Sequence, residues 1–159
     1  MSDIQPRKTK VKQRIFAVLL TIGAGILLYR ALRLPFFEGG LQRSAWWVVA
    51  LAFAEGAIDL ACMICSIRWL ITADRLHARL PMRFGTAATL LHAVRVLFFV
   101  LGRTGPLYNF DIRPEFRAAA SFDWFWVYFA AVLAALGVAA VIISWRLIVR
   151  YRKKEQTPS

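Results

Sequence analysis

Four long apolar blocks, separated by short polar segments, dominate the pattern of hydrophobic positions along this 159-residue chain. Because a helix rises about 1.5 Å per residue, each block can cross a hydrocarbon core of about 30 Å, the third with little to spare. The pattern predicts an all-α fold, a single four-helix transmembrane bundle between two basic tails. The helices are expected over residues 15–37, 45–71, 84–101 and 122–149, and the tails over 1–14 and 150–159.

Composition agrees with a membrane protein and argues against a soluble one. Hydrophobic residues make up 59% of the chain and the mean hydropathy is +0.54, which leaves too little polar surface for a soluble domain of this length. The net charge is +12, but Lys and Arg gather at the ends of the apolar blocks, where anionic lipid headgroups lie. We therefore predict contact with anionic headgroups at the cytoplasmic face and no nucleic-acid partner.

The distribution of Lys and Arg predicts the orientation of the helices. Fourteen of these residues lie in the two tails, in the segment between the second and third blocks, or at the adjoining ends of the second and fourth blocks, and six lie toward the other side. Cytoplasmic segments carry the excess of positive charge, so both termini of a four-span chain are expected in the cytoplasm. We interpret the chain as a multi-pass protein of a bacterial inner (cytoplasmic) membrane.

Two connecting segments differ in composition. Residues 72–83 (TADRLHARLPMR) are predicted to form a cytoplasmic loop whose basic side chains meet lipid headgroups. Residues 103–121 combine Pro, Gly, aromatic and oppositely charged residues. This mixture predicts an ordered cap over the outer end of the bundle.

The second block carries two carboxylates, Glu55 and Asp59, which lie four residues apart and so share one helix face. The third block carries His92 and Arg95 on a matching face. In an antiparallel hairpin all four side chains come close to mid-membrane depth, so we predict that Glu55 pairs with Arg95, and that His92 pairs with Asp59 or Glu55. The face of the second block comprises Val48, Ala52, Glu55, Asp59, Cys62 and Ser66, and that of the third comprises Ala88, His92, Arg95, Phe99 and Gly102.

We call Glu55, Asp59, His92 and Arg95 the charge cluster. A lone carboxylate or guanidinium at the bilayer centre costs about 2.5–3.5 kcal/mol on insertion scales, and mutual pairing offsets that cost. Two roles fit the pattern: a polar clamp between two helices, or a binding site. In the second role Arg30 and Arg33 of the first block would line the outer edge of the site and make it an anion pocket.

These features favour a non-enzymatic membrane protein. It would bind a polar or anionic small molecule or lipid at the charge cluster, or serve as a subunit of a membrane assembly with other proteins or further copies of itself. Two alternatives stay open. One is an intramembrane acid–base enzyme acting on a lipophilic substrate, with Glu55, Asp59 and His92 as its catalytic residues. The other is a proton-coupled transporter built as an oligomer.

Cys62 and Cys65 have the CxxC spacing of redox-active thiols. The chain holds no second cysteine pair to relay electrons, and the motif lies inside a continuous helix near the reducing cytoplasmic side. We therefore predict that both thiols are packing groups. His77 lies in the cytoplasmic segment, away from His92, so no bis-histidine haem site is expected. No metal and no other cofactor are predicted, and no motif identifies a known family.

Overall fold

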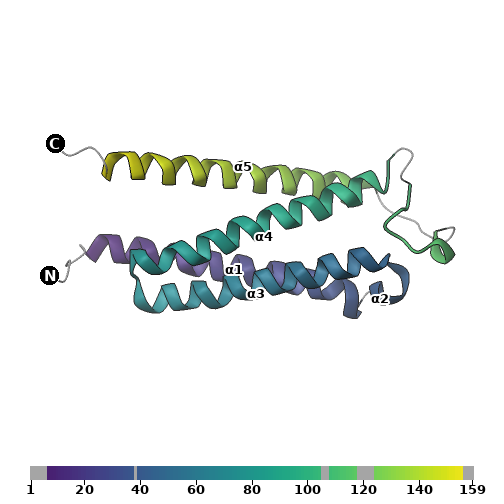
Figure 1. Cartoon of the computed structure of the whole chain (residues 1–159), viewed down its shortest axis with the longest axis horizontal. Helices are drawn as coiled ribbons and strands as arrows, with labels where there is room; N and C mark the ends of the chain where they lie inside the picture. Colours follow the sequence, from purple (N-terminus) through teal and green to yellow (C-terminus); the bar gives the residue numbers. More distant parts are fainter. Residues whose placement is uncertain (1–6, 38, 105–107, 118–123, 156–159) are drawn as a thin grey trace.

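The computed structural model describes residues 7–37, 39–104, 108–117 and 124–155, with side chains except at 7–9, 34, 75, 76, 126, 140 and 143–155. Most of these residues form four long helices (Figure 1): α1 (Arg7–Phe37), α3 (Trp46–Thr72), α4 (Arg75–Leu101) and α5 (Trp124–Glu155). Two short elements accompany them, the helix α2 (Gly40–Arg43) and the 3-10 helix η2 (Pro114–Phe116). The prediction of an all-α fold of packed helices is confirmed.

The helices are arranged around α3, which packs against both α1 and α4, while α5 packs against α4. Figure 1 shows α1 beginning and α5 ending at the same end of the bundle, where α3 and α4 also meet. We call this the tail end. The opposite end, which carries α2 and η2, is the cap end.

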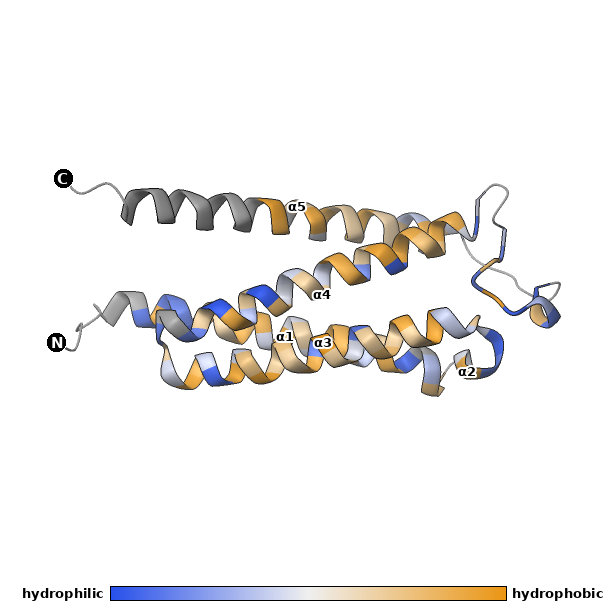
Figure 2. Cartoon of the chain, in the orientation of Figure 1, coloured by the Kyte–Doolittle hydropathy of each residue, from blue (hydrophilic) through white to orange (hydrophobic). Residues whose placement is uncertain are grey.

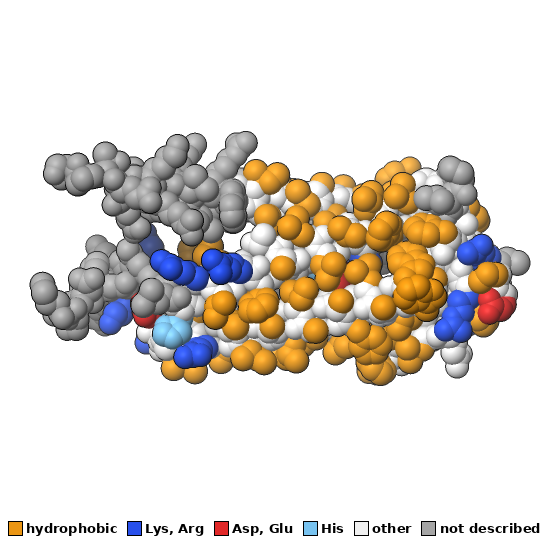
Figure 3. Space-filling view, in the orientation of Figure 1, with side chains coloured by type: hydrophobic (Ala, Val, Ile, Leu, Met, Phe, Trp, Pro, Cys, Tyr) orange, Lys and Arg blue, Asp and Glu red, His pale blue; other side chains and the backbone are white. Residues whose placement is uncertain are grey.

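Within the part of the chain that the structure describes, three helical stretches are long and apolar enough to cross a membrane: Lys10–Phe37, Trp46–Thr72 and His77–Leu101. The described part of α5 contributes a shorter apolar stretch, Val127–Ala139. Large apolar side chains stay exposed on all four long helices, far more than a soluble monomer leaves in water. Hydrophobic positions run along the helices (Figure 2), and Figure 3 shows apolar side chains over the middle of the molecule with Lys and Arg toward its ends. This surface is that of a multi-pass membrane protein.

The segment between α3 and α4 corrects one prediction. Residues 72–83 were expected to form a loop, but α4 begins at Arg75, so only Ala73 and Asp74 separate the two helices. Pro81 lies inside α4 near its beginning and is buried. A proline removes one helical hydrogen bond, and here it neither ends nor delays the helix, which begins before the predicted start of the third block at residue 84.

Small side chains let α1 approach α3 closely. Ala17, Ala24 and Ala31 recur every seven residues along α1 and are all buried. On α3, a Cβ added at Gly56 would meet the side chain of Leu32 at 3.4 Å. Close approach of small residues is a main source of helix association in lipid. It fixes α3 on one side and leaves its polar face for α4.

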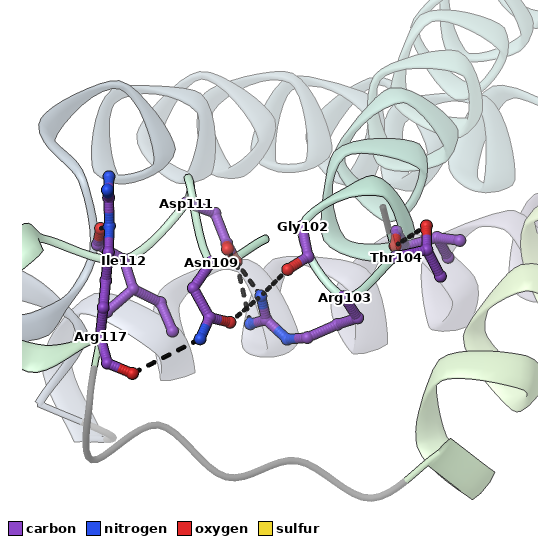
Figure 4. Close-up of polar contacts among 8 residues, drawn as sticks. Gly102, Arg103, Thr104, Asn109, Asp111, Ile112 and Arg117 are labelled. Atoms are coloured by element: carbon purple, nitrogen blue, oxygen red, sulfur yellow. Dashed lines mark hydrogen bonds and ion pairs between the residues drawn. The ribbon is translucent and has the colours of Figure 1, made fainter. Parts of the chain in front are cut away.

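The cap end is an ordered polar structure (Figure 4). Arg103 donates hydrogen bonds to both carboxylate oxygens of Asp111, at 2.6 and 3.0 Å, and a third to the side-chain oxygen of Asn109 at 3.3 Å. Backbone hydrogen bonds join it to the segment from the end of α2 to the N-cap of α3, from the Ala45 N–H to the Asp111 carbonyl and from the Arg113 N–H to the Arg43 carbonyl. The predicted cap is confirmed over 103–104 and 108–117. Its remaining residues, 105–107 and 118–121, lie outside the described chain.

Candidate functional site

One face of α3 supplies the acidic half of the charge cluster. Every residue predicted for that face is buried: Val48, Ala52, Glu55, Asp59, Cys62 and Ser66. The helix repeat of 3.6 residues explains this result, because positions three and four apart fall on one side. Gly56 and Trp69 are also buried, and the predicted face did not include them. Gly56 faces α1, and Trp69 donates a hydrogen bond from Nε1 to Gln13 of α1 at 3.4 Å.

The pairing of the four cluster residues is confirmed. Arg95 Nη1 lies 3.0 Å from Glu55 Oε2. His92 Nε2 lies 2.9 Å from Asp59 Oδ2, which is a hydrogen-bond distance, and His92 Nδ1 lies 3.5 Å from Glu55 Oε2. The imidazole ring therefore stands between the two carboxylates, with one nitrogen directed to each.

Burial divides the cluster into two parts. The side chains of Glu55 and Asp59 are 0% exposed, whereas those of His92 and Arg95 are 12% and 20% exposed. A charged group removed from water needs compensation by opposite charge and by hydrogen bonds. The acids are therefore held inside the protein, and the two basic side chains form the accessible edge of the cluster.

The carboxylates are not fully satisfied. Among the residues that the structure describes, Glu55 Oε1 and Asp59 Oδ1 have no hydrogen-bond partner. Glu55 Oε2 is within ion-pair distance of Arg95 and His92, and neither contact has hydrogen-bond alignment. Buried polar atoms in native proteins are nearly all hydrogen-bonded, so these two fully buried carboxylate oxygens are acceptors that lack a donor within the described chain.

The other predicted members of the site come from the first helix. Arg30 and Arg33 belong to α1, and both side chains are exposed. Their part in lining the cluster stays a prediction. The structure gives the site itself to α3 and α4.

The two cysteines are free thiols, Cys62 buried and Cys65 half-buried. Cys62 donates a weak hydrogen bond from Sγ to the Pro81 carbonyl of α4 at 3.6 Å, and a Cβ at Gly85 would lie 3.6 Å from the same sulfur. This contact supports a packing role. Within the described residues, no group of three or more His, Cys, Asp or Glu side chains has an arrangement that would hold a metal ion.

Sequence reasoning did not identify the partners of the cap. Arg103 and Asn109 are both buried at the cap end, and Arg103 also lies over the ring of Phe99, with its guanidinium carbon 4.7 Å from the ring centroid. The only signal in the sequence was the mixed charge of this segment.

Comparisons of the chain with known protein families, with curated proteins and with solved structures find no match.

Proposed function

We propose that this chain is a four-span membrane protein that binds a polar, hydrogen-bond-donating small molecule or lipid headgroup at the charge cluster. The observation that carries this proposal is the pair of unpartnered oxygens, Glu55 Oε1 and Asp59 Oδ1, on fully buried side chains. A site built for structure alone gains nothing from leaving such atoms unsatisfied, since each costs about 1–3 kcal/mol. A bound hydrogen-bond donor would supply the partners that these oxygens lack.

The charge of the cluster narrows the class of ligand. Arg95 lies against Glu55 and His92 lies against Asp59, so both basic side chains already have acidic partners within the protein. The atoms that lack partners are acceptors, and an anion would add to their negative charge. The geometry therefore supports a neutral or cationic donor, such as an amine, in place of the anion suggested by the arginines of α1.

Bound ligand is expected in the native protein. The full chain, extracted in mild detergent, should carry one polar small molecule or lipid in native mass spectrometry. Glu55→Gln should lower its occupancy roughly tenfold or more, because a hydrogen bond to a charged group contributes about 1.5–3 kcal/mol. Arg83→Gln, an exposed position of α4, serves as the control and should leave the occupancy unchanged.

Two results would count against the proposal. One is a wild-type chain that carries no ligand. The other is a Glu55→Gln variant with full stability and undiminished cellular function. The same mass spectra test the alternative that the chain is a subunit of a membrane assembly, which requires a protein partner in a fixed ratio to this chain.

A second function has its own supporting observation. His92 is hydrogen-bonded to Asp59 at 2.9 Å and remains partly exposed, which is the arrangement of a general base oriented by a buried carboxylate. An acid–base enzyme acting on a lipophilic substrate would use His92 in this way. It would show a bell-shaped dependence of rate on pH, which a pure binding site does not require.

We also propose that both termini face the cytoplasm and that the tail end contacts anionic lipid. Exposed Lys and Arg side chains gather there, on α1, α3 and α4: Lys10, Lys12, Arg14, Arg68, Arg79 and Arg83. The excess of positive charge marks the cytoplasmic side, and each basic side chain near an anionic surface adds about 1 kcal/mol of attraction.

Cysteine labelling in whole cells tests this orientation. With Cys62 and Cys65 replaced by Ala, the variants Lys10→Cys, Ser159→Cys and Glu115→Cys each carry one thiol. A membrane-impermeant maleimide should label Glu115→Cys, at the cap end, in intact cells. It should label the other two only after permeabilisation. Labelling of Lys10→Cys and Ser159→Cys from outside would reverse the orientation, and labelling of only one of them would exclude an even number of spans.

A further inference from the structure

We propose that the charge cluster is a proton-binding site that holds one proton, shared among His92, Asp59 and Glu55. This inference uses the placement of the cluster inside the bilayer from the proposed function. It does not depend on the identity of any ligand.

The first argument is charge balance. Glu55 and Asp59 contribute two negative charges and Arg95 one positive charge, so the cluster has a net charge of −1 before any proton is added to the imidazole or to a carboxylate. A net charge inside the hydrocarbon region is unfavourable in either sign. One added proton brings the cluster to neutrality, and a second would make it positive.

The second argument is the position of His92. Its Nε2 is 2.9 Å from Asp59 Oδ2 and its Nδ1 is 3.5 Å from Glu55 Oε2. A neutral imidazole carries one N–H, so its bare nitrogen would face a carboxylate oxygen unless that oxygen were protonated. With one added proton there are therefore two low-energy forms. Either the imidazolium lies between two carboxylates, or the neutral imidazole lies beside one carboxylic acid.

These forms interconvert by a balanced step. The Nε2–H bond of the imidazolium breaks and an O–H bond forms at Asp59 Oδ2, which leaves a neutral imidazole and a neutral acid. The equivalent transfer from Nδ1 to Glu55 Oε2 needs the 3.5 Å contact to shorten to a hydrogen bond. The imidazole thus links two acids placed one helical turn apart along α3.

Other charged groups near the cluster do not alter this balance. Cys62 lies on the same face of α3, one turn from Asp59, as a free thiol. The arginines of α1 at positions 30 and 33 are exposed. The side chains described for α5 include no Asp, Glu, Lys, Arg or His, and Tyr128 there is exposed.

The experiment counts protons on the full chain in nanodiscs of phosphatidylcholine at neutral pH. The chain has two histidines, so His77→Gln leaves His92 as the single signal in ¹⁵N-histidine spectra. Infrared spectra report the protonated carboxyl groups in the same sample. We expect a total of one proton, with His92 intermediate between imidazole and imidazolium and with a partial carboxyl band.

Matched variants give the proposal its sharpest test. Asp59→Asn or Glu55→Gln leaves one negative charge, which balances the positive charge of Arg95. The added proton should therefore be lost and His92 should become neutral. Cys62→Ala, a buried neighbour, should keep the count at one. A count of zero or two added protons in the wild-type cluster overturns the proposal, and so does a proton retained in both acid variants. A single proton that resides wholly on one group overturns the claim that the proton is shared. If the acid variants fail to fold, the wild-type count alone decides. A proton count other than one does not contradict the proposed ligand binding. Absence of a bound ligand does not contradict the proposed proton count.

Discussion

Arg95→Gln is expected to lower the free energy of unfolding by about 3–5 kcal/mol, because it leaves the buried carboxylate of Glu55 without its guanidinium. The measurement is unfolding of the detergent-solubilised protein, followed by circular dichroism. Arg83→Gln is the matched control: it removes an exposed arginine from the same helix and should change stability by no more than about 0.5 kcal/mol.

A second variant identifies the cause of that loss. In the double variant Glu55→Gln/Arg95→Gln the charge and its partner disappear together, so much of the lost stability should return. Low pH should act in the same direction on Arg95→Gln alone. A protonated Glu55 no longer needs a cation, so the deficit relative to wild type should shrink as pH falls. Equal losses in the single and double variants, with no response to pH, would show that the ion pair does not matter for folding.

Arg103→Met at the cap end is expected to cost about 3 kcal/mol, and its effect should be local. The substitution leaves the carboxylate of Asp111 and the side chain of Asn109 buried without their shared donor. Amide hydrogen exchange should accelerate over residues 108–113, where the hydrogen bonds of the cap gather. Arg117→Met removes an exposed guanidinium whose one described side-chain hydrogen bond is to the Ile112 carbonyl, so it should have a small effect.

Glycine at position 102 gives an independent check on the same cap. A Cβ there would lie 2.7 Å from Asp111 Oδ1 and 3.2 Å from the Phe98 carbonyl, so Gly102→Ala should displace Asp111 from Arg103. Gly23→Ala in α1 is the control, since no atom lies within 4 Å of its added Cβ, and alanine favours a helix. Slow exchange over residues 108–113 in both Arg103→Met and Gly102→Ala would mean that the cap is held by its apolar contacts instead. The ring of Trp47 stacked on that of Phe110 is one such contact.

Periodicity and depth were sufficient to predict the charge cluster. The spacing of Glu55 and Asp59 places them on one face, and counting residues from the block ends sets them level with His92 and Arg95. Lipid makes this reasoning strong, because an unpaired charge has no alternative partner in the hydrocarbon region. The start of α4 could not be found in the same way, since Pro81 suggests an end to helical structure and tertiary packing decides otherwise.

Contacts between segments that are far apart in the sequence could not be predicted from periodicity and depth. The cap depends on pairing between the start of α3 and residues 109–113, and no local pattern indicates which backbone groups meet. The sequence also could not predict that oxygens of Glu55 and Asp59 lack hydrogen-bond partners among the described residues, because composition shows that the charges balance but not which atoms are in contact. Those atoms support the proposed donor-binding site, and the anion pocket lined by Arg30 and Arg33 stays a prediction.

The two-residue turn between α3 and α4 bears on how the chain is made. As a nascent chain leaves the ribosome, α3 alone would offer the insertion machinery two acids and no cation among its central residues. Because only Ala73 and Asp74 separate the helices, α4 follows at once and brings Arg95 and His92 alongside. The pair would then partition into lipid as one helical hairpin whose charges are already neutralised. A short turn would thus favour insertion of the two helices together as well as their pairing in the finished fold.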